Sequence, residues 1–182
     1  MPQTLLAFVA IMLVTTYTLS VQQQYVFNQQ KDVSREIEEM AGSVALEVME
    51  VISARPFDQA VLDGTVTGTL DDLALFSFVN ATDHFTTGHA CSVFGTGLDL
   101  CDDLDDFHKM QTALIPFAMG VDTVYFNVDV EVYYVDDNLE RIDDRSFSKA
   151  VTVIVEDTWP GSDLEPYLAQ PIELSRIFSY EF

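Results

Sequence analysis

The first 30 residues carry no charged side chain, and residues 5–21 are mainly Leu, Val, Ile, Ala, Phe and Met. An apolar run of this length approaches the roughly 20 residues that a helix needs to cross a bilayer. A cleaved secretory signal is the competing interpretation, but it requires a basic leading segment and a small-residue cleavage motif, and neither is evident. The pattern predicts a membrane helix, with Leu5, Leu6, Phe8, Val9, Ile11, Met12, Leu13, Val14 and Leu19 as its apolar side chains.

The apolar residues after this run recur at helical spacing and form one stripe along a helix face. No proline occurs between Pro2 and Pro56, so nothing obliges the helix to end before Arg55. We therefore expect one continuous N-terminal helix whose second half is amphipathic and packs on a sheet. The stripe residues expected to face the sheet are Ile37, Met40, Val44, Val48 and Val51.

The rest of the chain shows the period of two that is typical of half-buried strands. The expected strands are residues 73–79, 121–135, 150–155 and 172–182, with an acidic hairpin loop at 136–144. Arg176 interrupts the apolar face of the last strand and indicates a sheet edge or an interface. The predicted fold is α+β, with a long N-terminal helix over residues 1–55 and an acidic, β-rich extracytoplasmic head over residues 56–182.

The charge is strongly one-sided, because 30 Asp and Glu face only eight Lys and Arg, giving a formal net charge of -22. Residues 56–182 hold 24 of the acidic residues and five of the basic ones. Such a surface repels phosphate backbones, so direct binding of nucleic acid is not expected. An acidic excess of this size also suits high salt, where screening removes most of the self-repulsion, and this favours a halophilic source.

The two cysteines, Cys91 and Cys101, lie close together in a loop rich in Gly, Thr and Asp. Because such a loop has few apolar residues to order it, we expect a disulfide between them and an oxidising compartment. Two reduced thiols are the alternative. Together with His84, His89 and His108 they could then bind zinc, but the spacing matches no standard ligand pattern, and solvated loop histidines are the simpler interpretation.

The acidic loops offer oxygen ligands for Ca²⁺, although neither reproduces an EF-hand loop. The better of the two candidate calcium sites comprises Asp99, Asp102, Asp103 and Asp105, with Asp106 beside them. Solvated charge is the favoured interpretation, so no metal or other cofactor is expected. Asn80 begins an N-glycosylation sequon. No nucleophile motif and no phosphate-binding loop is present, so an enzyme is not expected.

A long helix that is apolar first and amphipathic later, followed by an antiparallel sheet, resembles the type IV pilin and type II secretion pseudopilin superfamily. The C-terminal half is similar to the closing strands of minor pilins and pseudopilins. The similar segments are Ser-Phe-Ser-Lys-Ala-Val-Thr-Val-Ile-Val at 146–155, Trp159 with Pro160, and Pro-Ile-Glu-Leu-Ser at 171–175. That family usually has a Glu at the fifth position of the mature chain, where this sequence has Leu5, so the charge pairing made by that Glu is not expected.

The resemblance implies a structural subunit of an extracellular, type IV pilus-like filament. Such subunits are held in the membrane before assembly and are then polymerised with copies of themselves by a pilus assembly machinery, through packing of their N-terminal helices. The alternatives are a minor pilin or secretion pseudopilin, and a single-helix membrane-anchored sensor or ligand-binding domain. Adhesion, motility, DNA uptake and secretion are not distinguished by the sequence, because they depend on partners.

Overall fold

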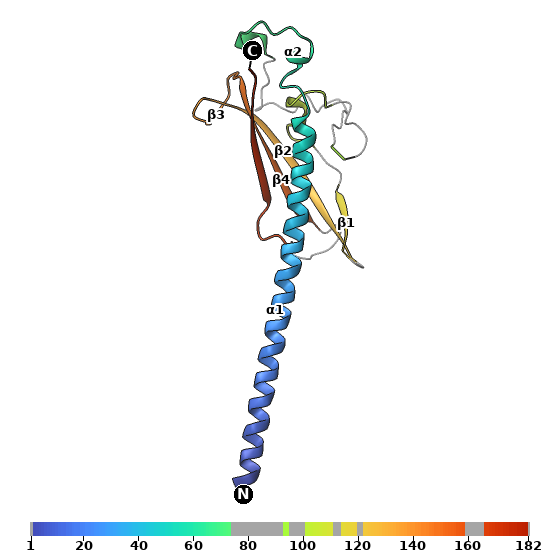
Figure 1. The fold of residues 1–182 in the computed structure, drawn as a ribbon, viewed down its shortest axis with the longest axis vertical. Helices are drawn as coiled ribbons and strands as arrows, with labels where there is room; N and C mark the ends of the chain where they lie inside the picture. The colour runs from blue at the N-terminus through green and yellow to red at the C-terminus, as the bar shows by residue number, and fades with distance from the viewer. Residues whose placement is uncertain are drawn as a thin grey trace. The chain divides into compact units, whose positions relative to one another are not determined.

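The computed structural model describes residues 2–73, 93–94, 101–110, 114–119, 122–158 and 166–181. The chain divides into two compact units, Met1–Glu39 and Met40–Phe182. The first unit is helical, and the second contains a helical segment, a sheet and several short turns (Figure 1). Helix α1, Pro2–Ser53, contributes to both units.

The bounds of α1 follow from its prolines. Pro2 stands at the first helical position, where a missing N–H costs nothing. The helix ends at Ser53, three residues before Pro56, which disfavours helical geometry in the residue before it. Two backbone bonds tighten this end, from Ala54 N to Val51 O at 3.3 Å and from Arg55 N to Ile52 O at 3.0 Å. Within the described residues, no helix has both the length and the apolar character that crossing a membrane requires.

The second unit is built on an antiparallel sheet. Its strands are β1 Ile115–Met119, β2 Asp122–Val135, β3 Arg141–Ile142, β4 Ser148–Thr158 and β5 Ile172–Ser179. They pair in the order β1-β2-β4-β5, and β3 pairs with the end of β2. The short elements are α2 Gln59–Leu62, η1 Leu70–Asp72 and η3 Asp105–Phe107. The predicted α+β fold, a long N-terminal helix followed by an antiparallel sheet, is confirmed.

Paired valines form the centre of the sheet. Val128, Val130 and Val132 of β2 lie opposite Val155, Val153 and Val151 of β4, and all six are buried. Cross-strand pairs of β-branched side chains pack closely on one face of the pleat. On β2 this face alternates with exposed Asp129 and Glu131. The apolar positions that alternate along β2 in the sequence are therefore the positions that face the core.

The helical segment Met40–Ser53 covers this sheet, and in Figure 1 it runs across β2 and β4. Val44 and Val48 are buried, as the predicted stripe requires. Met40 and Val51 are only half-buried, and Ala41 and Ile52 take the buried positions beside them. The stripe is therefore one residue away from the predicted line at both ends of this segment. In the first unit, the predicted stripe residue Ile37 is also buried.

The observed strands agree with three of the four predicted ones, with small changes at their ends. The fourth, residues 73–79, lies outside the described residues except for Leu73, which is buried at the end of η1. Strand β1 was not predicted, because Pro116 lies in its middle and a proline cannot donate a ladder hydrogen bond. Among the described strands β1 pairs with β2 alone, and an end strand tolerates a proline.

Arg176, the polar residue on the inner face of β5, reaches the end of α1. Its Nη1 donates a hydrogen bond of 3.0 Å to Ser53 Oγ, and its guanidinium lies 5.3 Å from the centre of the Phe178 ring. Arg176 therefore joins the end strand of the described sheet to the last turn of the helix. This contact accounts for the interruption in the apolar pattern.

Candidate functional site

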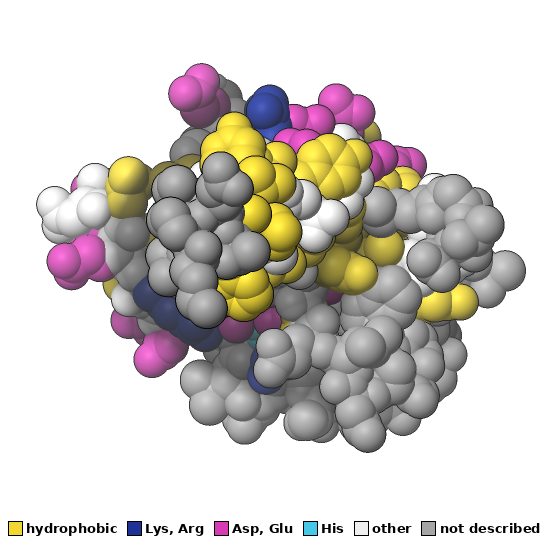
Figure 2. All heavy atoms as spheres, turned by 90° about the horizontal axis from the view of Figure 1, so that it is seen from below, with side chains coloured by type: hydrophobic (Ala, Val, Ile, Leu, Met, Phe, Trp, Pro, Cys, Tyr) yellow, Lys and Arg dark blue, Asp and Glu magenta, His cyan; other side chains and the backbone are white. Residues whose placement is uncertain are grey.

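The first unit presents a long apolar surface. We call this set of side chains the N-terminal apolar surface; it comprises Phe8, Val9, Ile11, Met12, Leu13, Val14, Tyr17, Leu19, Val21, Tyr25, Val26 and Phe27, all exposed. It includes every predicted core residue of the helix whose side chain is described; the side chains of Leu5 and Leu6 lie outside the described residues. Figure 2, viewed from below Figure 1, shows hydrophobic side chains gathered at the N-terminal end of α1. Exposed apolar surface of this extent marks an interaction site.

The N-terminal apolar surface surrounds the helix. Ile11, Met12, Leu13 and Val14 are consecutive and are 65%, 59%, 65% and 65% exposed. With 3.6 residues per turn, four consecutive positions cover the whole circumference of a helix. A helix that is apolar on all sides is normally buried on all sides, in a large core or in lipid. This part of α1 is therefore suited to burial on all sides, by several neighbouring helices or by lipid.

Three threonines within this segment do not make it polar. Thr15 Oγ1 donates to Ile11 O at 2.7 Å, Thr16 Oγ1 to Met12 O at 3.0 Å, and Thr18 Oγ1 to Val14 O at 2.8 Å. Each hydroxyl is satisfied by its own helix, so it needs no water or partner group. The threonines can therefore lie against other helices at little cost.

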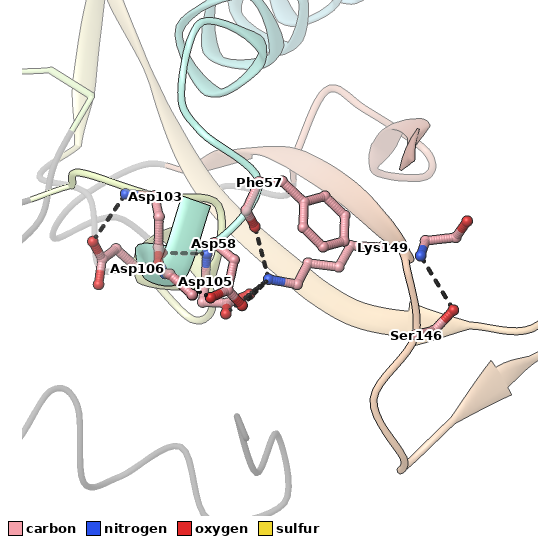
Figure 3. Close-up of polar contacts among 9 residues, drawn as sticks. Phe57, Asp58, Asp103, Asp105, Asp106, Ser146 and Lys149 are labelled. Atoms are coloured by element: carbon pink, nitrogen blue, oxygen red, sulfur yellow. Dashed lines mark hydrogen bonds and ion pairs between the residues drawn. The ribbon is translucent and has the colours of Figure 1, made fainter. Parts of the chain in front are cut away.

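A buried lysine is the chemically most distinctive feature of the second unit. Lys149 of β4 has no exposed surface. Its Nζ donates to Phe57 O at 2.7 Å and to Asp58 Oδ2 at 3.2 Å, and it lies 2.8 Å from Asp105 Oδ1 and 2.9 Å from Asp105 Oδ2 (Figure 3). It also lies 4.4 Å from the centre of the Phe57 ring. We call Lys149, Asp58 and Asp105 the lysine centre.

Each member of the lysine centre is placed by a different element. Lys149 lies on the inward face of β4 opposite Tyr134 of β2, whose ring centre is 5.3 Å from Nζ. Asp58 caps the N-terminus of α2, accepting a 3.0 Å hydrogen bond from Ala60 N. Asp105 opens η3. The centre therefore joins the sheet to two turns, and burial together with these acidic neighbours raises the pKa of Tyr134 above its usual range.

The acidic turn around η3 is partly buried, which corrects the expectation of solvated charge. Asp103 and Asp105 are buried, whereas Asp102 is exposed. Asp103 Oδ1 accepts from Asp105 N at 2.9 Å, and Asp106 Oδ2 accepts from Asp102 N at 2.9 Å. Burial raises the pKa of Asp103, Asp105 and Asp106 to about 6 each, and Lys149 opposes this shift at Asp103 and Asp105.

The predicted calcium ligands do not form one set. Asp102, Asp103 and Asp106 bring one carboxylate oxygen each within 4.8 Å of one another. Asp105 is not in this group, because it faces Lys149. Asp103 and Asp106 already accept backbone hydrogen bonds of the same turn, so these hydrogen bonds explain the geometry. Asp99 lies outside the described residues.

The cysteine and histidine predictions are covered only in part. Cys101 is buried and disulfide-bonded. Its predicted partner Cys91, the candidate zinc ligands His84 and His89, and the sequon residue Asn80 lie outside the described residues. His108 is buried, so the expectation of a solvated loop histidine is wrong for this residue. Its Nδ1 accepts a 2.9 Å hydrogen bond from Val132 N, which fixes the ring against β2.

The lysine centre was missed in the sequence, although a signal for it was present. In β4 the buried residues Val151, Val153 and Val155 share one face, and Lys149 continues the same alternation. A lysine at an inward position needs buried acidic partners. The partners, Asp58 and Asp105, are 91 and 44 residues away, and strand periodicity does not identify them.

No known protein family model matches this chain, and neither the curated proteins nor the solved structures include a significant match to it.

Proposed function

We propose that this chain is a structural subunit of a helical, extracellular filament of the type IV pilus kind. The observation that carries the proposal is the N-terminal apolar surface, which is exposed on every side of α1 at residues 11–14. Copies of α1 packed side by side would bury it. The acidic second unit would then form the coat of the filament. In this proposal the protein has no catalytic activity and is a pilin-like structural protein.

Copies of the same chain are the partners that best fit this surface. A different partner bound to one face would leave the other faces of the helix in water. Helical symmetry surrounds each helix with identical neighbours, and each neighbour offers the same uncharged, apolar surface. Many atom contacts of about 0.1–0.2 kcal/mol each then add up along the helix. The heads, with their excess of acidic residues, repel one another, so cohesion has to come from the helices.

The proposal also includes a stage before assembly. Within the described residues no helix is apolar enough to cross a membrane, but the side chains of Leu5 and Leu6 lie outside them. The proposal rests on the sequence instead: the first 30 residues have no charge, so residues 2–21 would be held in a membrane until an assembly machinery extracts them. Lipid would then be exchanged for neighbouring helices, and the apolar side chains would stay out of water throughout. The satisfied hydroxyls of Thr15, Thr16 and Thr18 suit both environments.

Two alternatives predict different assemblies. A minor pilin or secretion pseudopilin would use the same surface but would be scarce in filaments sheared from the cell surface. A membrane-anchored sensor or ligand-binding domain would remain monomeric on its anchor. The continuity of α1 from its apolar first part into the amphipathic stripe favours a filament subunit over the sensor, because a sensor gains nothing from a stripe that is continuous with its anchor.

The experiment compares the full chain with a chain that lacks residues 1–25, after removal of detergent. We expect the full chain to sediment as long polymers and the truncated chain to remain a soluble monomer, because the truncation removes most of the N-terminal apolar surface. Sedimentation velocity and negative-stain electron microscopy measure the difference. Filaments formed by the truncated chain would refute the proposal.

A further inference from the structure

The lysine centre holds an amine and two carboxyl groups together away from water. Nζ of Lys149 lies within 2.9 Å of both oxygens of Asp105 and within 3.2 Å of Asp58 Oδ2 (Figure 3). The side chains of Lys149 and Asp58 have no exposed surface, and that of Asp105 is 7% exposed. These groups come from β4, η3 and the N-cap of α2, so the fold itself brings the reactive atoms together.

As separate ions, the two carboxylates and the one ammonium of the lysine centre do not balance in charge. Two carboxylates and one ammonium leave a net negative charge in a buried site, and desolvation of such charges is costly. Transfer of a proton from Nζ to a carboxylate produces a neutral amine beside a neutral acid. These are the two groups that condense to an amide. The centres of the Phe57 and Tyr134 rings lie 4.4 Å and 5.3 Å from Nζ, and the two rings restrict the access of water to the site.

We propose that Lys149 and Asp105 are joined by an intramolecular isopeptide bond. The Nζ lone pair attacks Cγ of the protonated Asp105 carboxyl group, and the C–N bond forms as the C–O bond to the hydroxyl breaks. Asp58 accepts a proton from Nζ and passes it to the departing hydroxyl, which leaves as water. The reaction loses one water and requires no oxidant, reductant or other reactant. Groups held in such positions react with effective concentrations of about 10⁵–10⁸ M.

The geometry distinguishes the roles of the two acids. Both oxygens of Asp105 lie within 2.9 Å of Nζ, which places its carboxyl carbon next to the amine. Asp58 offers Nζ only Oδ2, and its Oδ1 accepts the N-cap hydrogen bond from Ala60 N. The Asp105 carboxyl group therefore acylates the Lys149 amine, and Asp58 relays the proton.

The bond would join β4 to η3 across 44 residues of sequence. The chain between Asp105 and Lys149 contains β1, β2 and β3. Pulling on the ends of the molecule could not extend this part of the sheet while the bond holds. A subunit that carries such a bond would resist mechanical unfolding, whether or not it assembles into a filament.

Mass spectrometry of the full chain, reduced and denatured, tests the proposal without any substitution. We expect a mass lower than that of the sequence by one water, and proteolytic mapping should identify one peptide pair joined through Lys149 and Asp105. An intact mass equal to that of the sequence would overturn the proposal. A link from Lys149 to Asp58 would also overturn it, because Asp105 is the assigned partner.

Two kinds of variant complete the test. The Asp63–Gly64 sequence can also lose one water, by forming a succinimide. The variant Asp63→Glu prevents this side reaction and leaves the lysine centre intact. The loss of water should persist in Asp63→Glu and should disappear in Lys149→Arg and in Asp58→Asn. If the mass of Lys149→Arg were still lower by one water, the isopeptide bond would be contradicted. If the mass of Asp58→Asn were still lower by one water, the proton relay through Asp58 would be contradicted.

Discussion

At the scale of single residues, Lys149 determines how two turns are held against the sheet. Its position on β4 is fixed by pairing with Tyr134 of β2 and Phe178 of β5. From there its Nζ reaches the Phe57 carbonyl and the carboxylates of Asp58 and Asp105. Until the proposed amide forms, a fully buried ammonium is tolerated only because all of these acceptors are present. The order of the two turns therefore depends on the Lys149 side chain, first as a cation and then as the proposed covalent link.

Removal of the Lys149 amine should destabilise the protein strongly. In Lys149→Met the carboxyl groups of Asp58 and Asp105 stay buried with neither a cation nor the proposed amide link. Loss of the buried cation alone costs about 3–5 kcal/mol. Urea unfolding followed by circular dichroism measures the loss. Arg35→Met is the matched control, because the Arg35–Glu39 ion pair is exposed and its loss should cost less than about 1 kcal/mol.

Equal stability losses in Lys149→Met and Arg35→Met would contradict this account of the lysine centre. Such a result would mean that the buried acids adapt to the loss of their cation, for example by remaining protonated.

At the scale of elements, η3 is a turn held together by its own acidic side chains. Asp103 and Asp106 accept backbone hydrogen bonds from neighbouring residues. Burial nevertheless raises the pKa of each to about 6. These groups therefore bind protons more tightly in the folded chain than in the unfolded chain, where the ordinary pKa is 3.8. The turn is less favourable in its fully charged form.

The pH dependence of stability follows from this difference. The free energy of unfolding should rise as the pH falls through 6 towards 3.8, because protonation then favours the folded state. Below 3.8 it should fall again, since hydrogen bonds from the Thr67 side chain and backbone lower the pKa of Asp72 to about 2. Denaturant titrations at several pH values give the curve.

The matched variants are Asp103→Asn, which keeps an oxygen to accept the backbone hydrogen bonds, and Asp129→Asn on the exposed face of β2. We expect Asp103→Asn to reduce the slope between pH 6 and 3.8, because it removes one of the groups whose pKa burial raises. Asp129→Asn is the control for the removal of one acidic side chain at an exposed position. Equal slopes in the wild-type chain and Asp103→Asn would refute the role assigned to this carboxyl group.

How much of the structure the sequence predicts depends on the range of the interactions. Helix α1 and strand β2 repeat one period over many residues, and both were identified from that period. Strand β1 was missed because Pro116 argues against a strand unless the strand lies at an edge, which only the tertiary fold decides. The lysine centre and the burial of Asp103 depend on partners distant in sequence or on packing, and local patterns contain neither.

At the scale of the whole molecule, the two units place their apolar residues differently. The second unit buries its valines between a sheet and a helical segment. The first unit exposes apolar side chains around the helix at residues 11–14. The net charge of -22 opposes unspecific association, but an apolar surface of this extent still favours burial against a partner or in lipid. Burial of α1 among copies of itself is the arrangement that we propose.

The most direct test of this claim compares two identical substitutions by electron microscopy. Leu13→Glu places a charge in the N-terminal apolar surface, whereas Leu62→Glu places one at an exposed leucine of α2 in the second unit. A carboxylate among packed apolar helices is costly to bury. We therefore predict filaments for the wild-type chain and for Leu62→Glu, and none for Leu13→Glu. Filaments of Leu13→Glu that match the wild type in number and diameter would contradict the account.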